Sequence, residues 1–365
     1  MTRQLSEKEK QWLMQMGADT ATTYPKDCTV TQLFEEIVVE YGNKLAVSSP
    51  EGILDYAQLN ERANQLARHL QAIGVKKGSF VGLTCERSLD MIIGILGILK
   101  AGAAYIPIDS NYPLERKLFM IEDAEISLLV TQQKFKNEFH LDSLRIVCMD
   151  SEREKLKQYP IDNLTCEGLS LDAACVYYTS GSTGKSKGVL IPHRGIVRLV
   201  RNTNCLSINP EDCFLQLQNI SFDGATFEIW GALLNGAKLH MYLPGKISLE
   251  QLAEHIVQNK ITVILLTTRL FNLLVEEQLD SLKNLRLLYT GGEAMSSRHA
   301  QMAFQALPFC KIINAYGPTE NTTLATTYVI PDLTSIAKEV PIGRPVSNTT
   351  VYILDEEFQS TTLLD

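Results

Sequence analysis

One stretch of the chain decides how the rest is interpreted: Tyr177-Tyr178-Thr179-Ser180-Gly181-Ser182-Thr183-Gly184-Lys185-Ser186-Lys187-Gly188. After its two tyrosines, this stretch contains only Gly, Ser, Thr and Lys. Small side chains leave backbone N–H groups uncovered, and hydroxyl and ammonium groups add further donors. A polyphosphate needs both kinds of group, so the stretch predicts a phosphate-binding loop. A Gly/Ser surface turn without a ligand is the alternative.

The loop is not a Walker A motif. Thr179 stands where that pattern requires its first Gly. A Walker loop also leads from a strand into a helix, whereas here residues 174–179 and 189–191 both have the composition of strands. A helix is expected only after Pro192. The sequence therefore predicts that the loop joins two strands.

Length and composition narrow the class of protein. A chain of 365 residues exceeds one typical core, so two or more packed units are expected. Its 45% hydrophobic and 21% charged residues are typical of a soluble globular protein. The net charge of −8 argues against a nucleic-acid binder. Eight scattered cysteines without a C-x-x-C pair favour reduced thiols in a cytoplasmic protein over disulfides or a zinc site.

No membrane association is expected. The first ten residues are polar and charged, unlike a signal peptide. The longest apolar run, residues 91–99, ends at Lys100 and is shorter than the ~20 residues that a spanning helix needs. This run instead predicts a buried helix.

Apolar periodicity predicts alternating helices and strands. Helices are expected at 30–41, 55–70, 89–100, 113–123, 196–202, 225–234, 249–258, 270–276 and 300–306. Strands are expected at 44–48, 80–84, 104–108, 127–131, 145–149, 174–179, 189–191, 212–217, 263–266, 285–289 and 312–315. This alternation indicates an α/β protein with mainly parallel sheets. We expect Arg194, Arg198 and Arg201 to lie on a solvated face rather than to contact phosphate.

A second motif follows about 130 residues after the phosphate loop: Asn314-Ala315-Tyr316-Gly317-Pro318-Thr319-Glu320. A Tyr ring can stack on adenine. A Thr hydroxyl can reach a phosphate, and a carboxylate can hold Mg²⁺ against phosphates. Together with the loop at 179–188, this motif resembles the adenylate-forming superfamily, which includes acyl-CoA synthetases, luciferases and the adenylation domains of nonribosomal peptide synthetases.

A third segment, residues 219–234, separates these branches. It is similar to the segment that opens the amino-acid pocket in peptide-synthetase adenylation domains, and the resemblance implies that Asp223 receives the substrate's α-ammonium group. A partly buried carboxylate pairs strongly with an ammonium group. Acyl-CoA synthetases usually lack this Asp. The alternative is that Asp223 only caps the helix that follows it.

The resemblance also implies a fold. It predicts the large N-terminal lobe of the adenylate-forming fold, with two mainly parallel sheets flanked by helices and a smaller β-rich subdomain. Residues 1–24 would form a linker with a peripheral helix, and residues 25–365 the AMP-binding core. The family's mobile C-terminal lobe, which carries a catalytic Lys, is expected to be absent from this stretch of chain.

The resemblance assigns roles to individual residues. Catalytic roles fall to Thr183, Lys185, Thr319 and Glu320, and Glu320 would also hold the metal. ATP and its phosphates would contact Thr179, Ser180, Gly181, Ser182, Thr183, Gly184, Lys185, Gly292, Glu293, Asn314, Ala315, Tyr316, Gly317 and Thr319. The amino-acid pocket would comprise Phe222, Asp223, Gly224, Phe227, Arg269, Tyr289, Gly291, Ala315, Thr323 and Leu324.

Arg269 does not fit the rest of that pocket. Asp223, Phe227, Gly291 and Thr323 resemble pockets for branched aliphatic amino acids, whereas a buried guanidinium needs a polar partner. Either the substrate has an acidic or polar side chain, or Tyr289 or Glu293 pairs with Arg269.

The function implied is activation of an amino acid by Mg²⁺ and ATP, which gives an aminoacyl adenylate and pyrophosphate. The acyl group would then be loaded onto the phosphopantetheine thiol of a carrier-protein domain. Implied partners are the amino acid, the carrier, neighbouring synthetase domains and a small helper protein. The alternatives are an acyl- or aryl-CoA ligase, and a binding module with little turnover.

Overall fold

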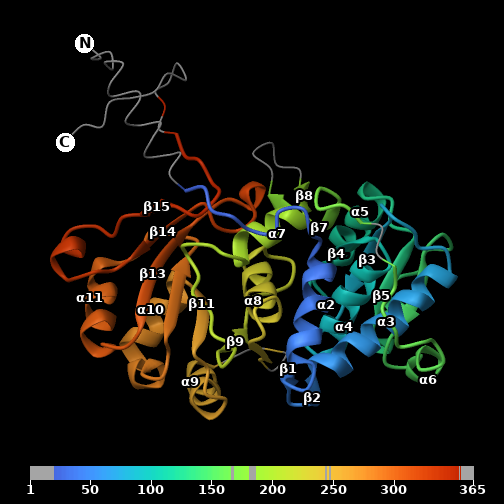
Figure 1. The fold of residues 1–365 in the computed structure, drawn as a ribbon, viewed down its shortest axis with the longest axis horizontal. Coiled ribbons are helices and arrows are strands. Elements are labelled where there is room, and N and C mark those ends of the chain that lie inside the picture. The colour runs from blue at the N-terminus through green and yellow to red at the C-terminus, as the bar shows by residue number, and fades with distance from the viewer. Residues whose placement is uncertain are drawn as a thin grey trace.

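The computed structural model describes residues 20–165, 168–180, 186–242, 245, 248–352 and 354. Helices and strands alternate along these residues and form two sheets with helices between and outside them (Figure 1). Each helix and strand predicted within these residues is present, and the ends differ by three residues at most. The predicted peripheral helix near the N-terminus lies outside the described residues.

The first sheet has six strands in the order β6-β5-β3-β4-β7-β8. Neighbouring strands are parallel except β7 and β8, which form an antiparallel pair in which Thr179 faces Lys187. The predicted strand-to-strand connection at the proposed phosphate loop is therefore confirmed. The strands are β3 (Phe80–Thr84), β4 (Ala104–Pro107), β5 (Leu128–Thr131), β6 (Arg145–Cys148), β7 (Ala173–Ser180) and β8 (Ser186–Pro192).

The second sheet has nine strands in the order β15-β14-β13-β12-β11-β9-β10-β1-β2. The strands from β13 to β1 run parallel, and antiparallel strands close both edges. The expected smaller β-rich subdomain is not a separate unit among the described residues, because β13–β15 continue this sheet. The strands are β1 (Leu45–Ser49), β2 (Gly52–Asp55), β9 (Cys213–Gln216), β10 (Lys238–Met241), β11 (Val263–Thr267), β12 (Leu287–Gly291), β13 (Lys311–Tyr316), β14 (Thr326–Val329) and β15 (Arg344–Pro345).

One hydrophobic core joins the two sheets through five helices that pack with them (Figure 1). These helices are α2 (Val30–Tyr41), α3 (Tyr56–Ala72), α4 (Leu89–Lys100), α7 (His193–Val200) and α8 (Gly224–Leu233). Every residue of α4, and every residue of α8 after Gly224, is buried. Helices that are apolar on all sides belong in the interior of a protein, and here they lie between the sheets.

The outer faces of the sheets have separate cores. Three helices cover the nine-stranded sheet, α9 (Leu249–Gln258), α10 (Thr268–Glu277) and α11 (Ser297–Ala306). The six-stranded sheet is covered by α5 (Leu114–Asp123), whereas the short α6 (Arg153–Leu156) contacts α3 and contributes Leu156 to the shared core. Four short 3₁₀ turns complete the described elements, η1 (Gln133–Glu138), η2 (Leu279–Leu282), η3 (Thr319–Asn321) and η4 (Thr334–Ile336).

Side-chain caps explain why several helices begin where they do. The side chains of Thr29 and Asp55 each accept a hydrogen bond from the backbone N–H three residues on, and the glutamine at that position accepts one from the backbone N–H of the cap residue. These reciprocal capping boxes satisfy donors that a helix start leaves unpaired. Ser88 caps α4 by accepting a hydrogen bond from the N–H of Met91.

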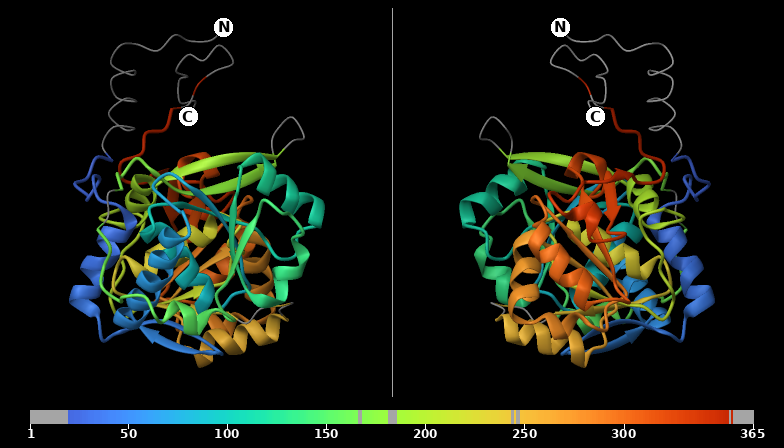
Figure 2. Two further views of the ribbon diagram at one scale, coloured as in Figure 1. Left: turned by 90° about the vertical axis from the view of Figure 1, so that its right-hand side faces the viewer. Right: turned by 90° about the vertical axis from the view of Figure 1, so that its left-hand side faces the viewer.

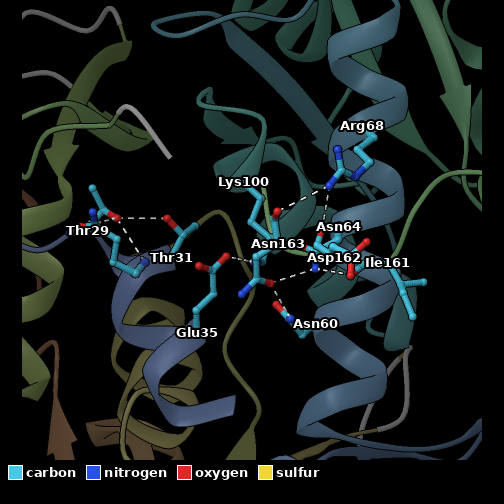
Figure 3. Close-up of polar contacts among 11 residues, drawn as sticks. Thr29, Thr31, Glu35, Asn60, Asn64, Arg68, Lys100, Ile161, Asp162 and Asn163 are labelled. Atoms are coloured by element: carbon cyan, nitrogen blue, oxygen red, sulfur yellow. Dashed lines mark hydrogen bonds and ion pairs between the residues drawn. The ribbon is translucent and has the colours of Figure 1, made fainter. Parts of the chain in front are cut away.

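Polar contacts also hold residues 161–163, which precede β7, against the central helices (Figure 3). Asn64 of α3 donates to the Ile161 carbonyl over 2.6 Å, and both Asn60 and Asn64 donate to the side-chain oxygen of Asn163. At the end of α4, the buried Lys100 forms an ion pair with Glu35 of α2. The segment is thereby held against α3, and α2 against α4.

The beginning and the end of the described chain lie together, as the side views show (Figure 2). The backbone N–H of Asn348 donates to the Thr20 carbonyl over 2.8 Å, and Thr20 Oγ1 donates to the Thr349 carbonyl over 2.8 Å. No helix among the described residues is long and apolar enough to cross a membrane.

The prediction of a solvated face for the α7 arginines is wrong for Arg198. Its side chain is buried, with the residue only 7% exposed, and it bonds to backbone carbonyls. Arg201 donates to the Leu234 carbonyl. Arg194, the first of the three, pairs near the surface with Asp27. Periodicity did not reveal this because α7 packs against other elements on most of its sides.

Acid should weaken the junction of α2 and α7 through His193. This buried side chain accepts the Val30 N–H at Nδ1 (3.2 Å), and burial lowers the pKa of His193 to about 4. Because the unfolded chain binds the proton near pH 6.5, His193 contributes stability above that pH and loses it as pH falls towards 4. His193→Asn should flatten the pH dependence of the unfolding free energy by about 1–3 kcal/mol across this window.

Urea titrations at several pH values would measure this effect. His140→Asn is the matched control, because His140 is exposed. Buried His240 has a similarly lowered pKa and leaves a residual slope in both variants. An unchanged pH slope in His193→Asn would contradict the assignment.

Candidate functional site

A cavity of about 200 Å³ lies where three parallel strands of the nine-stranded sheet end. The strands are β11, β12 and β13, and the first residue of α8 also lines the cavity. Ligands of open parallel sheets bind outside the carboxyl ends of the strands. The lining residues are Gln218, Phe222, Asp223, Gly224, Leu265, Leu266, Thr267, Gly291, Gly292, Ala315, Gly317, Thr323 and Leu324.

Strand register sets one wall of this cavity. Thr267, Gly291 and Ala315 face one another across β11, β12 and β13. A Cβ at Gly291 would lie 2.4 Å from the Ala315 carbonyl oxygen, so only glycine permits this approach of the strand ends. The ends of β12 and β13 therefore meet at this wall with no side chain between them.

Asp223 lies at this cavity, immediately before the helix α8. It occupies the N-cap position of α8, but its side chain makes no capping hydrogen bond. The alternative of a purely capping role is therefore not supported. Burial raises the pKa of Asp223, although hydrogen bonds from Thr319 and nearby backbone oppose the effect. No basic side chain of the described residues forms an ion pair with it, so a cationic ligand group would offset its desolvation.

A buried carboxylate supports the segment that leads to Asp223. Glu228 of α8 is 1% exposed and accepts hydrogen bonds from the backbone N–H groups of Leu217 and Gln218. Burial raises the pKa of Glu228 to about 8. Gln218 in turn donates from Nε2 to the Leu265 carbonyl over 3.2 Å. The chain before Asp223 is thereby tied to both α8 and β11.

The structure brings together most of the predicted amino-acid pocket. Seven of its residues line the one cavity: Phe222, Asp223, Gly224, Gly291, Ala315, Thr323 and Leu324. Phe222 is 60% exposed and lies at the edge of the cavity. Phe227 and Tyr289 are fully buried behind the wall, with ring centroids 4.7 Å apart, and Tyr289 donates its hydroxyl to the Cys205 carbonyl.

Arg269 lies elsewhere. It is exposed on the first turn of α10 and does not line the cavity. Neither Tyr289 nor Glu293 pairs with it among the described residues. Three residues of β11 line the cavity instead, Leu265, Leu266 and Thr267, and Leu265 faces Tyr289 in register. Sequence reasoning missed Leu265 because the segment lacks a flanking motif, although its place two residues before the end of β11 was a usable signal.

The second motif turns out of β13 directly beside the cavity. Tyr316, 52% exposed, ends the strand, and Thr319 and Glu320 belong to the turn η3. Asn314 is buried, and its side chain donates to the Pro341 carbonyl over 2.8 Å. Gly292 and Glu293 follow β12 and are exposed.

The two sequence motifs approach each other at this turn, because η3 contacts β8. Thr179 and Ser180 end β7 and pair with Lys187 and Ser186 of β8. Five predicted phosphate contacts lie outside the described residues: Gly181, Ser182, Thr183, Gly184 and Lys185. Strand β8, which follows the loop that contains them, therefore passes close to the turn with Thr319 and Glu320.

The residues present fit a metal only as part of a nucleotide complex. No group of three or more His, Cys, Asp and Glu side chains that could hold a metal ion occurs within the described ranges. Glu320 is an exposed carboxylate, and Mg²⁺ in such sites takes one or two carboxylates together with substrate phosphates and waters. Glu320 thus matches a shared site rather than a protein-only one.

Comparison with known proteins agrees with this geometry. The family model of the AMP-binding enzyme matches residues 34–362. One of the linear gramicidin synthase proteins of Brevibacillus parabrevis is 46% identical over 98% of this chain, which spans only 5% of that relative's length. Gramicidin S synthase 2 of Brevibacillus brevis is 41% identical over 96% of this chain, which spans 8% of its length.

Solved structures are similar over most of the chain. The N-terminal subdomain of Klebsiella oxytoca NpsA, bound to 3-hydroxybenzoyl-AMSN, superposes with a TM-score of 0.82 at 31% identity, covering 92% of this chain and 83% of that one. The nonribosomal peptide synthetase FmoA3 (S1046A), in its alpha-methyl-L-serine-AMP bound form, gives a TM-score of 0.89 at 25% identity, covering 98% of this chain and 40% of that one. The chain belongs to the AMP-binding enzyme family, as the N-terminal core of an adenylation domain of the nonribosomal peptide synthetase type.

Proposed function

We propose that the protein binds Mg²⁺-ATP and an α-amino acid and joins them into an aminoacyl adenylate, with release of pyrophosphate. The observation that carries the proposal is Asp223, a carboxylate without a basic partner among the described residues. It lines a cavity next to the Tyr316–Glu320 motif. An α-ammonium group at Asp223 would leave the substrate's carboxylate near Thr319 and Glu320.

The reaction balances without an acid–base step. An oxygen of the amino-acid carboxylate attacks the α-phosphorus of ATP, a new acyl–phosphate bond forms, and the bond to pyrophosphate breaks with its electron pair. The carboxylate is already ionised at neutral pH, so the chain's contribution is positioning and charge stabilisation. Mg²⁺, when bound with ATP, supplies positive charge for the phosphates.

Individual residues have distinct proposed tasks. Asp223 orients the ammonium group, Tyr316 offers an exposed ring face to adenine, and Thr319 donates to the α-phosphate. Glu320 would hold the metal ion that accompanies the phosphates. Thr183 and Lys185 are proposed to stabilise charge on the phosphates as part of the 179–188 loop, on the strength of the sequence pattern alone.

The lining favours an apolar substrate side chain. Leu265, Ala315 and Leu324 provide apolar walls, and Gly291 adds no side chain. With Arg269 outside, the cavity contains no basic group among the described residues to recognise an acidic side chain. We therefore propose a branched aliphatic or similar neutral amino acid. A carrier-protein thiol and neighbouring synthetase domains are the proposed recipients of the product.

A second candidate is activation of an aryl or other plain carboxylic acid. The similarity to NpsA, whose structure holds a 3-hydroxybenzoyl ligand, favours it. A plain acid has no ammonium group for Asp223, so this candidate leaves that carboxylate without a task. A binding module with little turnover is a third possibility, which the same experiment separates.

Exchange of pyrophosphate into ATP across a panel of amino acids and plain carboxylic acids tests the proposal. The chain should be assayed both alone and joined to the C-terminal lobe of a relative. We expect exchange with one or a few apolar α-amino acids. Asp223→Asn should lower kcat/KM for them at least about 100-fold, because an ion pair in a partly buried site is lost.

The comparison with plain acids provides the control. Asp223→Asn should change exchange with the deaminated analogue of the preferred amino acid by less than about threefold. Exchange driven equally well by the analogue in the wild type would refute the role of Asp223. Saturable ATP binding without exchange in either form would support the binding module.

The shape of the cavity predicts a change of preference. Leu265→Ala should shift kcat/KM towards larger side chains by about tenfold, because it enlarges one apolar wall. Arg269→Ala is the matched control on the adjoining α10 and should leave the preference unchanged, since Arg269 is exposed. If only Arg269→Ala altered the preference, this description of the pocket would be wrong.

A further inference from the structure

Arg198 of α7 binds the bend of the chain at Asn321–Leu324, which borders the candidate site. The guanidinium NH2 group donates to the carbonyls of Asn321 (2.7 Å), Thr322 (3.2 Å) and Leu324 (3.2 Å). Its NH1 group donates to the Leu324 carbonyl (3.3 Å) and to Thr349 Oγ1 (2.7 Å). One buried side chain thus binds three backbone carbonyls of this bend.

The bend needs such support because its backbone is unusual. Thr322 and Thr323 both adopt left-handed conformations, with φ of 56° and 68°. For a residue with a side chain this conformation costs roughly 1–2 kcal/mol, and more for a β-branched one. It also turns successive carbonyls towards one side, where their partial negative charges repel. A cation with several donors at that point stabilises the arrangement.

Helix α7 approaches the bend closely for a second reason. A Cβ at Gly195 would lie 2.5 Å from Thr322 Oγ1. Gly195 stands three residues before Arg198, and residues three apart share a helix face. The missing side chain at Gly195 and the guanidinium at Arg198 therefore serve one contact between α7 and the bend.

The bend connects the two halves of the candidate site. The η3 turn with Thr319 and Glu320 precedes it, and the cavity-lining Thr323 and Leu324 belong to it. Thr323 Oγ1 also donates to the backbone carbonyl of Asp223 over 2.9 Å. A displacement of the bend would therefore move a cavity wall and the support of Asp223 together.

We propose that Arg198 is a positioning residue for substrate recognition: it fixes the Asn321–Leu324 bend, and through it the walls that contact the amino acid. This proposal rests on the proposed function, because it concerns the same cavity. Arg198 thereby affects selectivity although its side chain contacts neither ATP nor the amino acid.

The competing explanation is that Arg198 only stabilises the fold. Arg201 provides a matched control for this explanation. It lies directly after the same helix, and it donates to the Leu234 carbonyl (2.6 Å) and Asn235 Oδ1 (3.4 Å), away from the bend. Loss of Arg201 should therefore affect stability without affecting the cavity.

Steady-state exchange kinetics of Arg198→Met, Arg198→Lys and Arg201→Met test the proposal, at a temperature where thermal melts show all variants folded. Arg198→Met should raise KM for the preferred amino acid at least about tenfold and narrow its advantage over smaller and larger analogues. Arg198→Lys should recover part of the loss, because an ammonium can donate to some of the same carbonyls. Arg201→Met should keep KM and preference within about twofold.

A second pair of variants leaves the guanidinium in place. Gly195→Ala should push Thr322 away and raise KM in the same direction. Gly195→Ala combined with Thr322→Ala should restore KM towards the wild-type value, because the obstructing Oγ1 is removed. Equal KM and preference in wild type, Arg198→Met and Gly195→Ala would overturn the proposal, as would equal effects of Arg198→Met and Arg201→Met.

Assays of the wild-type protein distinguish failure of the positioning role from failure of the proposed function. If it shows no amino-acid-dependent exchange and no saturable binding of the amino acid, the proposed function fails first. If it is active while the Arg198 variants keep its KM and preference, only the positioning role is refuted.

Discussion

The burial of α8 between the two sheets is the constraint on which the site depends. All residues of this helix after Gly224 are buried, so it can pack only where apolar surface is available on every side. Both sheets contribute to that surface within one core. The helix therefore has one position, and its N-terminus carries Asp223 to the carboxyl ends of β11–β13. Glu228, on the same helix, fixes the preceding segment from within the core.

Charge is distributed unevenly around this position. The carboxyl of Asp223 is desolvated without an ion-pair partner among the described residues, which is unfavourable for the empty protein. A short distance away, the Arg198 guanidinium is buried but bound by carbonyls and a hydroxyl. One buried charge is thus satisfied by the fold, whereas the other has no ion-pair partner among the described residues. The proposed recognition role of Asp223 rests on this contrast.

Glycines at the strand ends shape the cavity beside Asp223. Gly291 allows β12 and β13 to meet without an intervening side chain, and Gly317 likewise leaves no room for one, since a Cβ there would lie 2.3 Å from the Thr323 carbonyl oxygen. The cavity wall is consequently made of backbone at its centre and of apolar side chains at its sides. Such a wall can select substrate side chains that are uncharged and that fit the size of the cavity.

The sequence by itself determined the order and type of most helices and strands and the strand-to-strand connection between β7 and β8, because apolar periodicity and cap residues are encoded within a few neighbouring positions. Through the resemblance of its local motifs to the adenylate-forming superfamily, the sequence also predicted most of the residues that line the cavity. It missed the short strands β2, β10 and β14, which have little apolar pattern of their own. Only the tertiary structure decided that Leu265 rather than Arg269 lines the cavity, and that Arg198 is buried against the 321–324 bend. These facts depend on strand register and on contacts between residues more than 100 positions apart, such as Arg198 and Asn321. A local pattern contains no information about which distant carbonyls a side chain will meet.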